Sequence, residues 1–496
     1  MINHLLLYLF LFPLLGTVIL IFVNENKLNT LKTIAAITTG IQMWIIVQLI
    51  FNFDTNIGYL QYVEQISWIN LLNIDFIIGL NGVNLVFLTL STILFFTAIF
   101  INWKERYHQK SFYVLIMLLN TAVTGLFMSY DLFLFTVFYG IALFSTFLLI
   151  TLFTEKSNGY TAGFFTFCAL TSFCLIIIGV LLINNQAVSY SFNLYALAQN
   201  PSILSNIQTS GFYIFLIGFI IITPIVPFQS WYLGAIETAP TSLAVILLAL
   251  IPKIGIFGIL NILLPLFPQS TFRFAVLFGI IGSLNILYFA FTVFSHTDYR
   301  KIIGHFTGFS TALIFIGLSS IISGRLQQSA ATISGLNGVV IYSFSSALII
   351  IGLLLIPKVR DHITNLAAEP PSNRWVAVFM LLMVLASAIG LPGFLNFIGQ
   401  FLCLIGAFHH WSTAIMSLLA MIGLVLVGIK FFRIISDTIH QNNQIQFSIR
   451  ENEISYEFIV LPIILIFLFF LGIFPGAILQ FINHSLRDIA TSLTTL

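Results

Sequence analysis

The stretch GFYIFLIGFIIITPIVPFQSWYLGAIETAPTSLAVILLALIPKIGIFGIL, residues 211–260, is apolar enough for two membrane-spanning helices. Its first half contains Pro224 and Pro227, and its second half contains Pro252 directly before Lys253. A proline inside a helix removes a backbone donor and clashes with the preceding turn, so we expect both helices to be interrupted about half-way. In hydrocarbon, the backbone groups freed in this way must be buried in protein or line a wet cavity.

Lys253 is the ionisable side chain at these interruptions. An ionisable group inside a membrane is a functional candidate by default. The alternative is a lysine close to a helix end, whose ammonium group reaches the interface. The apolar run extends from Ser242 to Leu264. This places Lys253 near mid-depth and favours a functional role.

The composition identifies the class of protein. The chain of 496 residues is 59% hydrophobic and only 7% charged, with a mean hydropathy of +1.07. These values are typical of a polytopic membrane protein and exclude a soluble one. The three cysteines, Cys168, Cys174 and Cys403, stand singly in apolar runs, so they form no redox or metal motif.

Apolar runs separated by polar, glycine or proline residues predict an all-α fold with about fourteen transmembrane helices. The twelfth run is too long for one straight helix and contains Gly390-Leu391-Pro392-Gly393, so Pro392 should break it. The predicted spans are residues 4–23, 32–53, 78–102, 111–129, 131–153, 160–184, 209–233, 240–263, 272–296, 302–322, 333–356, 375–408, 411–436 and 457–483.

Lysine and arginine residues indicate how these spans are oriented. When they are assigned to alternate sides, 14 of the 18 lie on one side and only Arg273, Arg325 and Arg487 lie on the other, with Lys253 in the core. The positive-inside rule then places both termini outside.

The acidic residues fall in loops or at helix ends, so none is expected at mid-membrane. Asp131 opens the fifth span, and Glu237 lies between the seventh and the eighth. A proton path needs groups that titrate at depth. The titratable candidates are Lys253, Glu237 and His305, which lies at a shallow position in the tenth span. Gln400 in the twelfth span is a fourth candidate for the path, as a hydrogen-bonding group.

Broken spans in corresponding halves of a chain are typical of transporters with inverted repeats. The breaks at the seventh and twelfth spans therefore suggest two five-helix repeats. We predict an N-terminal three-helix segment, two repeats, and a C-terminal loop with the last span, at residues 1–110, 111–265, 266–436 and 437–496.

Several short stretches resemble the antiporter-like membrane subunits of respiratory complex I, the family of NADH:ubiquinone oxidoreductase chain 4 and bacterial subunit M. The resemblance covers nearly the whole chain. The stretches that carry it are Asp131–Phe135, Pro224–Trp231, Ala239–Thr241, Asp298–Ile303, Leu391–Gly393 and Phe397–Phe401.

The resemblance implies a subunit of the proton-pumping membrane arm, without a redox site of its own. It implies that NADH, FMN, iron–sulfur clusters and ubiquinone are bound by other subunits. The implied partners are neighbouring membrane-arm subunits and lipids, and no nucleic acid. Together with 53 phenylalanines against six tryptophans, it favours the mitochondrial inner membrane, with the N-terminus on the intermembrane-space side. A bacterial plasma membrane is the alternative.

Members of this family have titratable groups along the membrane midplane, and this chain departs from that pattern. The family's helix-five glutamate falls on Gly140, its helix-seven lysine on Ile222 and its helix-twelve glutamate on Gln400. Only the helix-eight lysine is retained, as Lys253.

A family histidine on helix eleven falls between Ile341 and Ser343, where no histidine stands. We therefore expect a membrane-arm subunit whose own proton path is degraded, with Gln400 as a hydrogen-bonding group that cannot titrate. The alternatives are an active cation/proton antiporter-type subunit of a related complex and a purely structural membrane scaffold.

Overall fold

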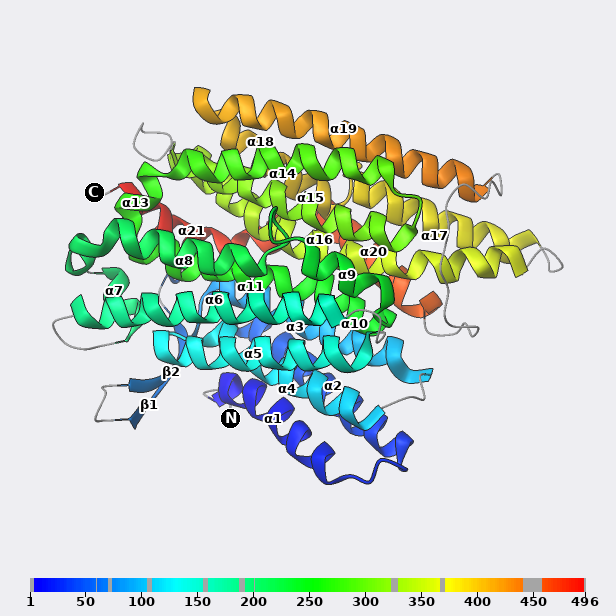
Figure 1. Cartoon of the computed structure of the whole chain (residues 1–496), viewed down its shortest axis with the longest axis horizontal. Coiled ribbons are helices and arrows are strands. Elements are labelled where there is room, and N and C mark those ends of the chain that lie inside the picture. The colour runs from blue at the N-terminus through cyan, green and yellow to red at the C-terminus, as the bar shows by residue number, and fades with distance from the viewer. Residues whose placement is uncertain are drawn as a thin grey trace. The chain divides into compact units, whose positions relative to one another are not determined.

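The computed structural model describes residues 4–58, 60–69, 74–104, 109–154, 159–186, 192–199, 201–322, 329–365, 371–439 and 457–494. Within these ranges the chain is mostly helical (Figure 1), so the predicted polytopic helical fold is confirmed. Contacts divide it into two compact units. The division does not address internal symmetry, so the repeats stay a prediction. Most of the predicted C-terminal loop after residue 437 lies outside the described residues.

Unit 1 consists of residues 1–223, 250–273 and 480–496. Within it, α1 packs on α2 and α4, α4 packs on α5, and α6 packs on α8. Its elements are α1 (Leu5–Phe22), α2 (Leu28–Asn52), β1 (Gln61–Ile69), β2 (Ile74–Leu80), α3 (Gly82–Ile101), α4 (Gln109–Met128), α5 (Leu132–Phe153), α6 (Gly159–Gln186), α7 (Leu194–Gln199), α8 (Gln208–Ile222), α11 (Ile251–Gly258), α12 (Leu264–Leu266), α13 (Pro268–Arg273) and most of α21 (Gly476–Thr494).

Unit 2 consists of residues 224–249 and 274–479. Here α14 packs on α15 and α19, and α16 packs on α15 and α18. Its elements are α9 (Ser230–Thr238), α10 (Thr241–Val245), α14 (Ala275–Ser295), α15 (Tyr299–Ser319), α16 (Ser329–Asn365), α17 (Pro371–Ile389), α18 (Leu395–Phe408), α19 (Trp411–Ile439) and α20 (Glu457–Ile473).

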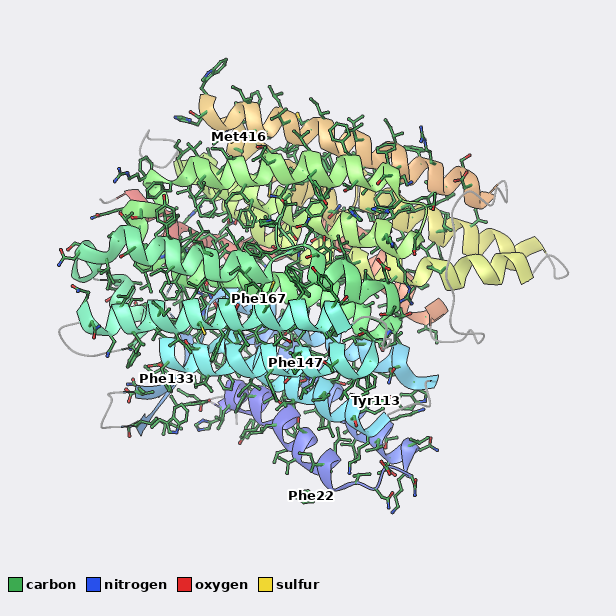
Figure 2. All side chains as sticks on the ribbon, viewed as in Figure 1. Phe22, Tyr113, Phe133, Phe147, Phe167 and Met416 are labelled. Atoms are coloured by element: carbon green, nitrogen blue, oxygen red, sulfur yellow. The ribbon has the colours of Figure 1, made fainter. Side chains whose placement is uncertain are left out.

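Twelve helices of the described chain are long and apolar enough to cross a membrane. Large apolar side chains are exposed on these helices in unit 1, such as Phe22, which is 84% exposed, and Phe167, which is 63% exposed. Figure 2 labels both, and Phe22 projects away from the ribbon of α1. Such side chains are favourable only against lipid or another apolar surface. The chain is thus a multi-pass membrane protein, while the exact number of crossings stays a prediction.

The predicted breaks at the seventh and twelfth spans are confirmed. The helix α8 ends at Ile222, and α9 begins only at Ser230, beyond Pro224 and Pro227. Similarly, α17 ends at Ile389 and α18 begins at Leu395, with Pro392 between them.

The predicted interruption at Pro252 is wrong. The chain stays helical from Thr241 to Leu266, and π-helical turns at Ile246–Leu250 and Ile259–Leu263 flank the α-helical segment that contains Pro252. A wider turn accommodates a proline ring without ending the helix, because the carbonyl that would clash is displaced.

The sequence analysis also missed two local features. One is the antiparallel hairpin of β1 and β2, which lies between the second and third predicted spans and whose last residues, 78–80, fall inside the third. The other is the end of α20 at Ile473, followed by α21 at Gly476, so the predicted span 457–483 is not one helix. Pro475 stands directly before α21, where a proline favours the start of a helix over continuation of the previous one.

Candidate functional site

Lys253 lies on α11 in unit 1 and is completely buried. Its helix closely approaches the last turn of α8. A Cβ added at Gly255 would lie 2.7 Å from the carbonyl oxygen of Phe219, and one at Gly258 would overlap the Phe219 ring. Lys253 is therefore buried in protein, and its depth in the membrane stays a prediction. Lys253 is held inside unit 1, on a helix packed against the end of the broken span.

The position of the family's helix-five carboxylate, Gly140, is closed by an aromatic ring. A Cβ added at Gly140 would lie 2.8 Å from Cε2 of Phe173 on α6. The position of the helix-seven lysine is the fully buried Ile222, in the last turn of α8. Both positions are therefore filled with apolar groups, and no titratable side chain stands at either.

A short chain of hydroxyl groups lies beside Gly140. The hydroxyls of Tyr139 and Ser172 are 2.5 Å apart, and Ser172 donates a hydrogen bond of 2.7 Å to the carbonyl of Gly218 on α8. Since the Ser172 proton is used in this bond, Tyr139 donates to Ser172. This arrangement links α5, α6 and α8 by hydrogen bonds, so it stabilises the packing of the three helices without placing a charge there.

The break between α17 and α18 in unit 2 is closed by an asparagine. Asn396 Nδ2 donates to the carbonyls of Ser387 and Ala388 at 3.0 and 3.4 Å, and its Oδ1 accepts from Ser345 on α16 at 3.1 Å. These carbonyls belong to the last turn of α17, where a helix leaves acceptors without intrahelical partners. Asn396 thus satisfies backbone groups that the break exposes.

Gln400 lies against the same break. A Cβ added at Gly390, which has a φ of +88°, would lie 2.0 Å from Oε1 of Gln400. Gln400 is 4% exposed, and the hydroxyl of Tyr342 on α16 is its polar neighbour. No hydrogen bond of ordinary geometry to a described residue satisfies Nε2 of Gln400 or the hydroxyl of Tyr342, and buried polar groups in this state are costly.

The positions on α16 assigned to the missing family histidine flank Tyr342. Ile341 and Ser343 are buried, and Ser343 bonds the carbonyl of Val339 in its own helix. Neither side chain titrates near neutral pH. The polar neighbour of Gln400 on this helix is therefore Tyr342.

The other break is stabilised in the same way within unit 2. Asn285 Oδ1 on α14 accepts from the backbone N–H of Val226 at 2.8 Å, and its Nδ2 donates to Ile281 in its own helix. Asparagine side chains therefore satisfy backbone groups at both breaks. The sequence contained the signal, since Asn285 and Asn396 are polar residues inside apolar runs, but they were overlooked in favour of titratable groups.

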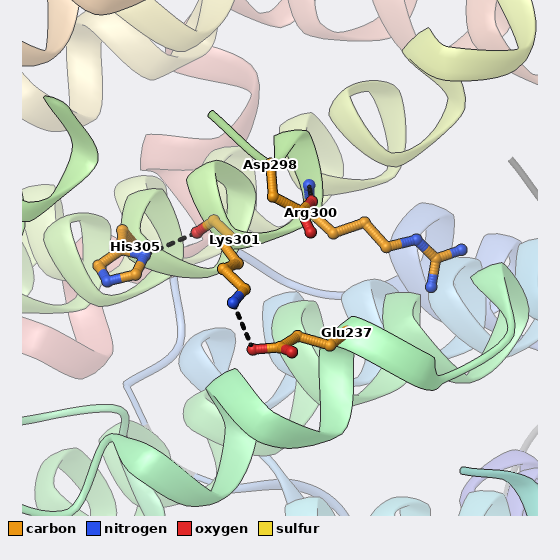
Figure 3. A network of polar contacts seen from close by, with 5 residues as sticks. All are labelled: Glu237, Asp298, Arg300, Lys301 and His305. Carbon is orange, nitrogen blue, oxygen red and sulfur yellow. Dashed lines mark hydrogen bonds and ion pairs between the residues drawn. The ribbon is translucent and has the colours of Figure 1, made fainter. Parts of the chain in front are cut away.

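Glu237 and His305 are brought into one network by Lys301 (Figure 3). Lys301 Nζ lies 3.1 Å from Glu237 Oε1 in an ion pair that is about one-third exposed. The carbonyl of Lys301 accepts a hydrogen bond of 2.7 Å from His305 Nδ1. The rings of His305 and His296 lie 4.6 Å apart between centroids. Titratable groups from α9 and α15 thus form one contiguous patch.

Further charges surround this patch. Lys430 on α19 donates to the carbonyl of His296 at 2.8 Å. Burial lowers the pKa of His296, and the nearby charge of Lys301 lowers it further. Asp298 caps the start of α15 by accepting from the N–H of Arg300. The guanidinium of Arg300 in turn donates to the carbonyls of Ile236 and Ala239 at the end of α9.

The predicted site residues therefore do not form one site. Glu237 and His305 share a network in unit 2, Gln400 lies at the second break in the same unit, and Lys253 is in unit 1. Among the described residues, no group of three His, Cys, Asp or Glu side chains has an arrangement that would hold a metal ion.

Comparisons with known proteins extend over nearly the full length. The family described as NADH:quinone oxidoreductase/Mrp antiporter, TM, matches residues 129–429. NADH-ubiquinone oxidoreductase chain 4 of Arabidopsis thaliana is 24% identical over 495 residues, covering 97% of this chain and 96% of that protein. NADH-quinone oxidoreductase subunit M of Rickettsia typhi is 26% identical over 491 residues, covering 96% and 97%.

A solved structure of similar fold is a chain of respiratory complex I from Thermus thermophilus with bound NADH. It superimposes with a TM-score of 0.81 at 20% sequence identity, covering 99% of this chain and 100% of that one. At this identity the likeness shows a shared fold.

Proposed function

Because the chain belongs to the NADH:quinone oxidoreductase/Mrp antiporter transmembrane family, we propose that it is an antiporter-like membrane-arm subunit of a proton-pumping NADH:ubiquinone oxidoreductase, respiratory complex I. Full-length relatives bear the names chain 4 and subunit M of this enzyme. In this proposal, NADH, FMN, the iron–sulfur clusters and ubiquinone bind to other subunits, and this chain performs no electron transfer. Its partners are neighbouring antiporter-like subunits and membrane lipids.

The proton path of this subunit is reduced or lost. The observation that carries this proposal is the closure of the Gly140 position by Phe173, since a carboxylate there is what would hold a charged partner at the midplane. Ile222 and Gln400 cannot titrate near neutral pH, which leaves Lys253 without the three other groups that the resemblance implies. A buried lysine alone does not make a relay across the membrane.

The test is the ratio of protons moved to electrons transferred in the reconstituted complex. Lys253→Met is expected to leave this ratio and the rate of NADH oxidation unchanged, and Ile254→Val on the same helix serves as the control. A lower ratio in Lys253→Met with assembly intact would mean that protons still pass through this subunit.

An active antiporter-type subunit is the second candidate, and the patch around Lys301 is the observation that favours it. Glu237 and Lys301 form an ion pair, and His305 bonds the main-chain carbonyl of Lys301. In this case Glu237→Gln would lower proton movement while electron transfer persists. A purely structural scaffold would instead tolerate both Glu237→Gln and Lys253→Met.

We propose the mitochondrial inner membrane as the location, with the N-terminus on the intermembrane-space side, and a bacterial plasma membrane as the alternative. The relatives include a plant protein and bacterial ones. An epitope placed before His4 should be digested by protease added to mitochondria with a ruptured outer membrane. Protection of that epitope until the inner membrane is opened would show that the N-terminus lies on the opposite side.

A further inference from the structure

A cavity of about 510 Å³ lies in unit 1, at the end where α3 and α5 begin. Small-molecule sites commonly have volumes of roughly 300–1,000 Å³, so the cavity is large enough for a headgroup-sized ligand. Its wall has both polar and apolar parts. The residues that matter here are Leu60, Tyr130, Leu194, Asn261, Asp488 and Ile489.

Hydrogen bonds hold this end of unit 1 together. Tyr130, just before α5, receives a bond at its carbonyl from Leu194 of α7 and donates from its backbone to Ile77 of β2. On another side, Ser485 of α21 accepts from the N–H of Gly82, at the start of α3. The cavity is therefore a formed site with a rigid frame.

The cavity also reaches alongside a membrane span. Throughout the span Thr241–Leu266 every residue is buried except Asn261 and Pro265, and both line the cavity. Asn261 is five residues from the end of that span, a helical rise of about 7–8 Å. The cavity thus begins at the end of the span and extends into the depth of the membrane region.

The inner end of the cavity presents a hydrogen-bond acceptor. Asn261 Nδ2 and the hydroxyl of Tyr130 both donate to Oδ1 of Asn84, at 2.8 and 3.3 Å. Asn84 Nδ2 itself donates to the carbonyl of Phe127. The hydroxyl of Tyr130 also interacts with the side chain of Asn81. These bonds leave the carbonyl oxygen of Asn261 for a ligand, so the inner end suits a group that donates.

Among the described residues of this wall, Asp488 on α21 supplies the only charged side chain, and none of them is a lysine, arginine or histidine. His484, one turn earlier on α21, acts on Asp488 electrostatically but is not part of the wall. Gly58 keeps the approach to the carboxylate open, because a Cβ there would lie 2.9 Å from Asp488 Oδ2.

We propose that this cavity binds the ammonium headgroup of a membrane phospholipid, such as phosphatidylethanolamine. The ammonium, which has three donors and no acceptor, pairs with Asp488 and bonds Asn261, and the ring of Tyr130 adds a cation–π contact. The apolar rim of Leu60, Leu194 and Ile489 takes the glycerol and first acyl carbons. A free amine has no apolar part that would pack on this rim. An anionic headgroup would be repelled by the carboxylate of Asp488.

The test measures lipid retained by the full chain, purified with its native partners into nanodiscs of phosphatidylethanolamine and phosphatidylglycerol in equal amounts. Native mass spectrometry should show one tightly held phosphatidylethanolamine. Asp488→Asn is expected to lower its retention at least fivefold, Asp488→Glu to restore it, and Asp488→Lys to exchange it for phosphatidylglycerol. Glu25→Gln, an exposed acidic residue of the α1–α2 connection, is the matched control.

A second variant keeps the test decisive if substitutions at Asp488 impair folding. Ala198→Phe narrows the cavity without changing charge and should also lower retention of phosphatidylethanolamine. Equal retention in Asp488→Asn, Asp488→Lys and the unsubstituted chain would overturn the proposal. Displacement of the lipid by millimolar ethanolamine would overturn the lipid assignment in favour of a soluble amine. These results do not depend on the proposed function, because no proton movement is measured.

Discussion

The aromatic ring of Phe173 occupies the space into which a side chain at Gly140 would project, 2.8 Å from the position of the missing Cβ. The two residues lie on neighbouring helices, α5 and α6, that pack directly on one another. A carboxylate therefore cannot be placed at residue 140 unless Phe173 moves. The glycine at residue 140 and the position of the Phe173 ring are thus two parts of one packing arrangement.

This arrangement predicts that Gly140→Ala destabilises the chain by up to about 2 kcal/mol. Alanine favours a helix by about 1 kcal/mol over glycine, but overpacking against the ring costs typically about 1–3 kcal/mol. Adding Phe173→Leu to Gly140→Ala should recover the loss, because the shorter side chain makes room. Thermal unfolding of the full chain in detergent measures both.

Gly163→Ala on α6 is the matched control, since nothing lies within 4 Å of a Cβ at that position. It should be neutral or slightly stabilising. If Gly140→Ala behaves like Gly163→Ala, the ring of Phe173 adapts freely, and the Gly140 position is not closed.

The asparagine at the second break gives another prediction. Asn396→Ala removes hydrogen bonds to Ser387, Ala388 and Ser345, each worth roughly 1 kcal/mol. We expect a loss of about 2–3 kcal/mol, against about 1 kcal/mol for Ser345→Ala. Ser334→Ala, where the hydroxyl is exposed and bonds its own helix, should change stability by less than about 0.5 kcal/mol.

The stabilities of these variants are compared by unfolding them in detergent, with the loss of the helical circular dichroism signal as the readout. An Asn396→Ala chain as stable as Ser334→Ala would show that the carbonyls of α17 find other partners, such as water. The break would then not depend on Asn396.

Asp131 predicts a dependence of stability on pH. Burial, opposed by hydrogen bonds from the N–H groups of Phe133 and Leu134, raises the pKa of Asp131 from 3.8 to about 6. A carboxyl whose pKa is raised on folding binds its proton more tightly in the folded chain. Its contribution therefore favours folding most below pH 3.8, declines as the pH rises towards 6, and is constant above that.

Asp131→Asn should remove this dependence, because asparagine caps the start of α5 equally well but does not titrate. The free energy of unfolding changes by at most about 3 kcal/mol between pH 4 and 6 through this group, since each unit of pKa shift is worth about 1.4 kcal/mol. Denaturant unfolding in detergent at several pH values checks it. An unchanged slope in Asp131→Asn would assign the effect to other groups.

Much of the fold follows from the sequence because hydrocarbon imposes few solutions. Apolar runs near 20 residues must be helices, and prolines such as Pro224 and Pro392 favour breaks in them because each removes a backbone donor and clashes with the preceding turn. Pro252 shows the limit of this reasoning. Whether a proline ends a helix or widens a turn depends on what packs around it, which a single sequence does not contain.

The candidate site was predicted only in its residue types. The sequence identified Lys253, Glu237 and His305 as titratable groups, but not that Lys301 joins Glu237 to His305. It showed that a carboxylate is missing at Gly140 but not that Phe173 fills the space. Contacts between residues distant in the chain decide these points, and one sequence without relatives does not show them.

Arg300 provides the last prediction. Its guanidinium donates to the carbonyls of Ile236 and Ala239, which close the C-terminal end of α9 after the first break. Both bonds leave from one nitrogen, Nη1, and the positive charge is favourable at a helix C-terminus. Arg300→Lys keeps the charge, but its side chain is one atom shorter and does not reach the position of Nη1, so we expect a loss of about 1–2 kcal/mol, and more for Arg300→Met. Arg433→Lys, on the exposed side of α19, keeps a cation near the ring of Phe294 and should stay within about 0.5 kcal/mol. Hydrogen exchange of α9 gives a local reading: Arg300→Lys should speed exchange at Ala235 and Ala239 while α14 is unaffected. If exchange rises equally in α14, or not at all, the guanidinium does not hold the end of α9.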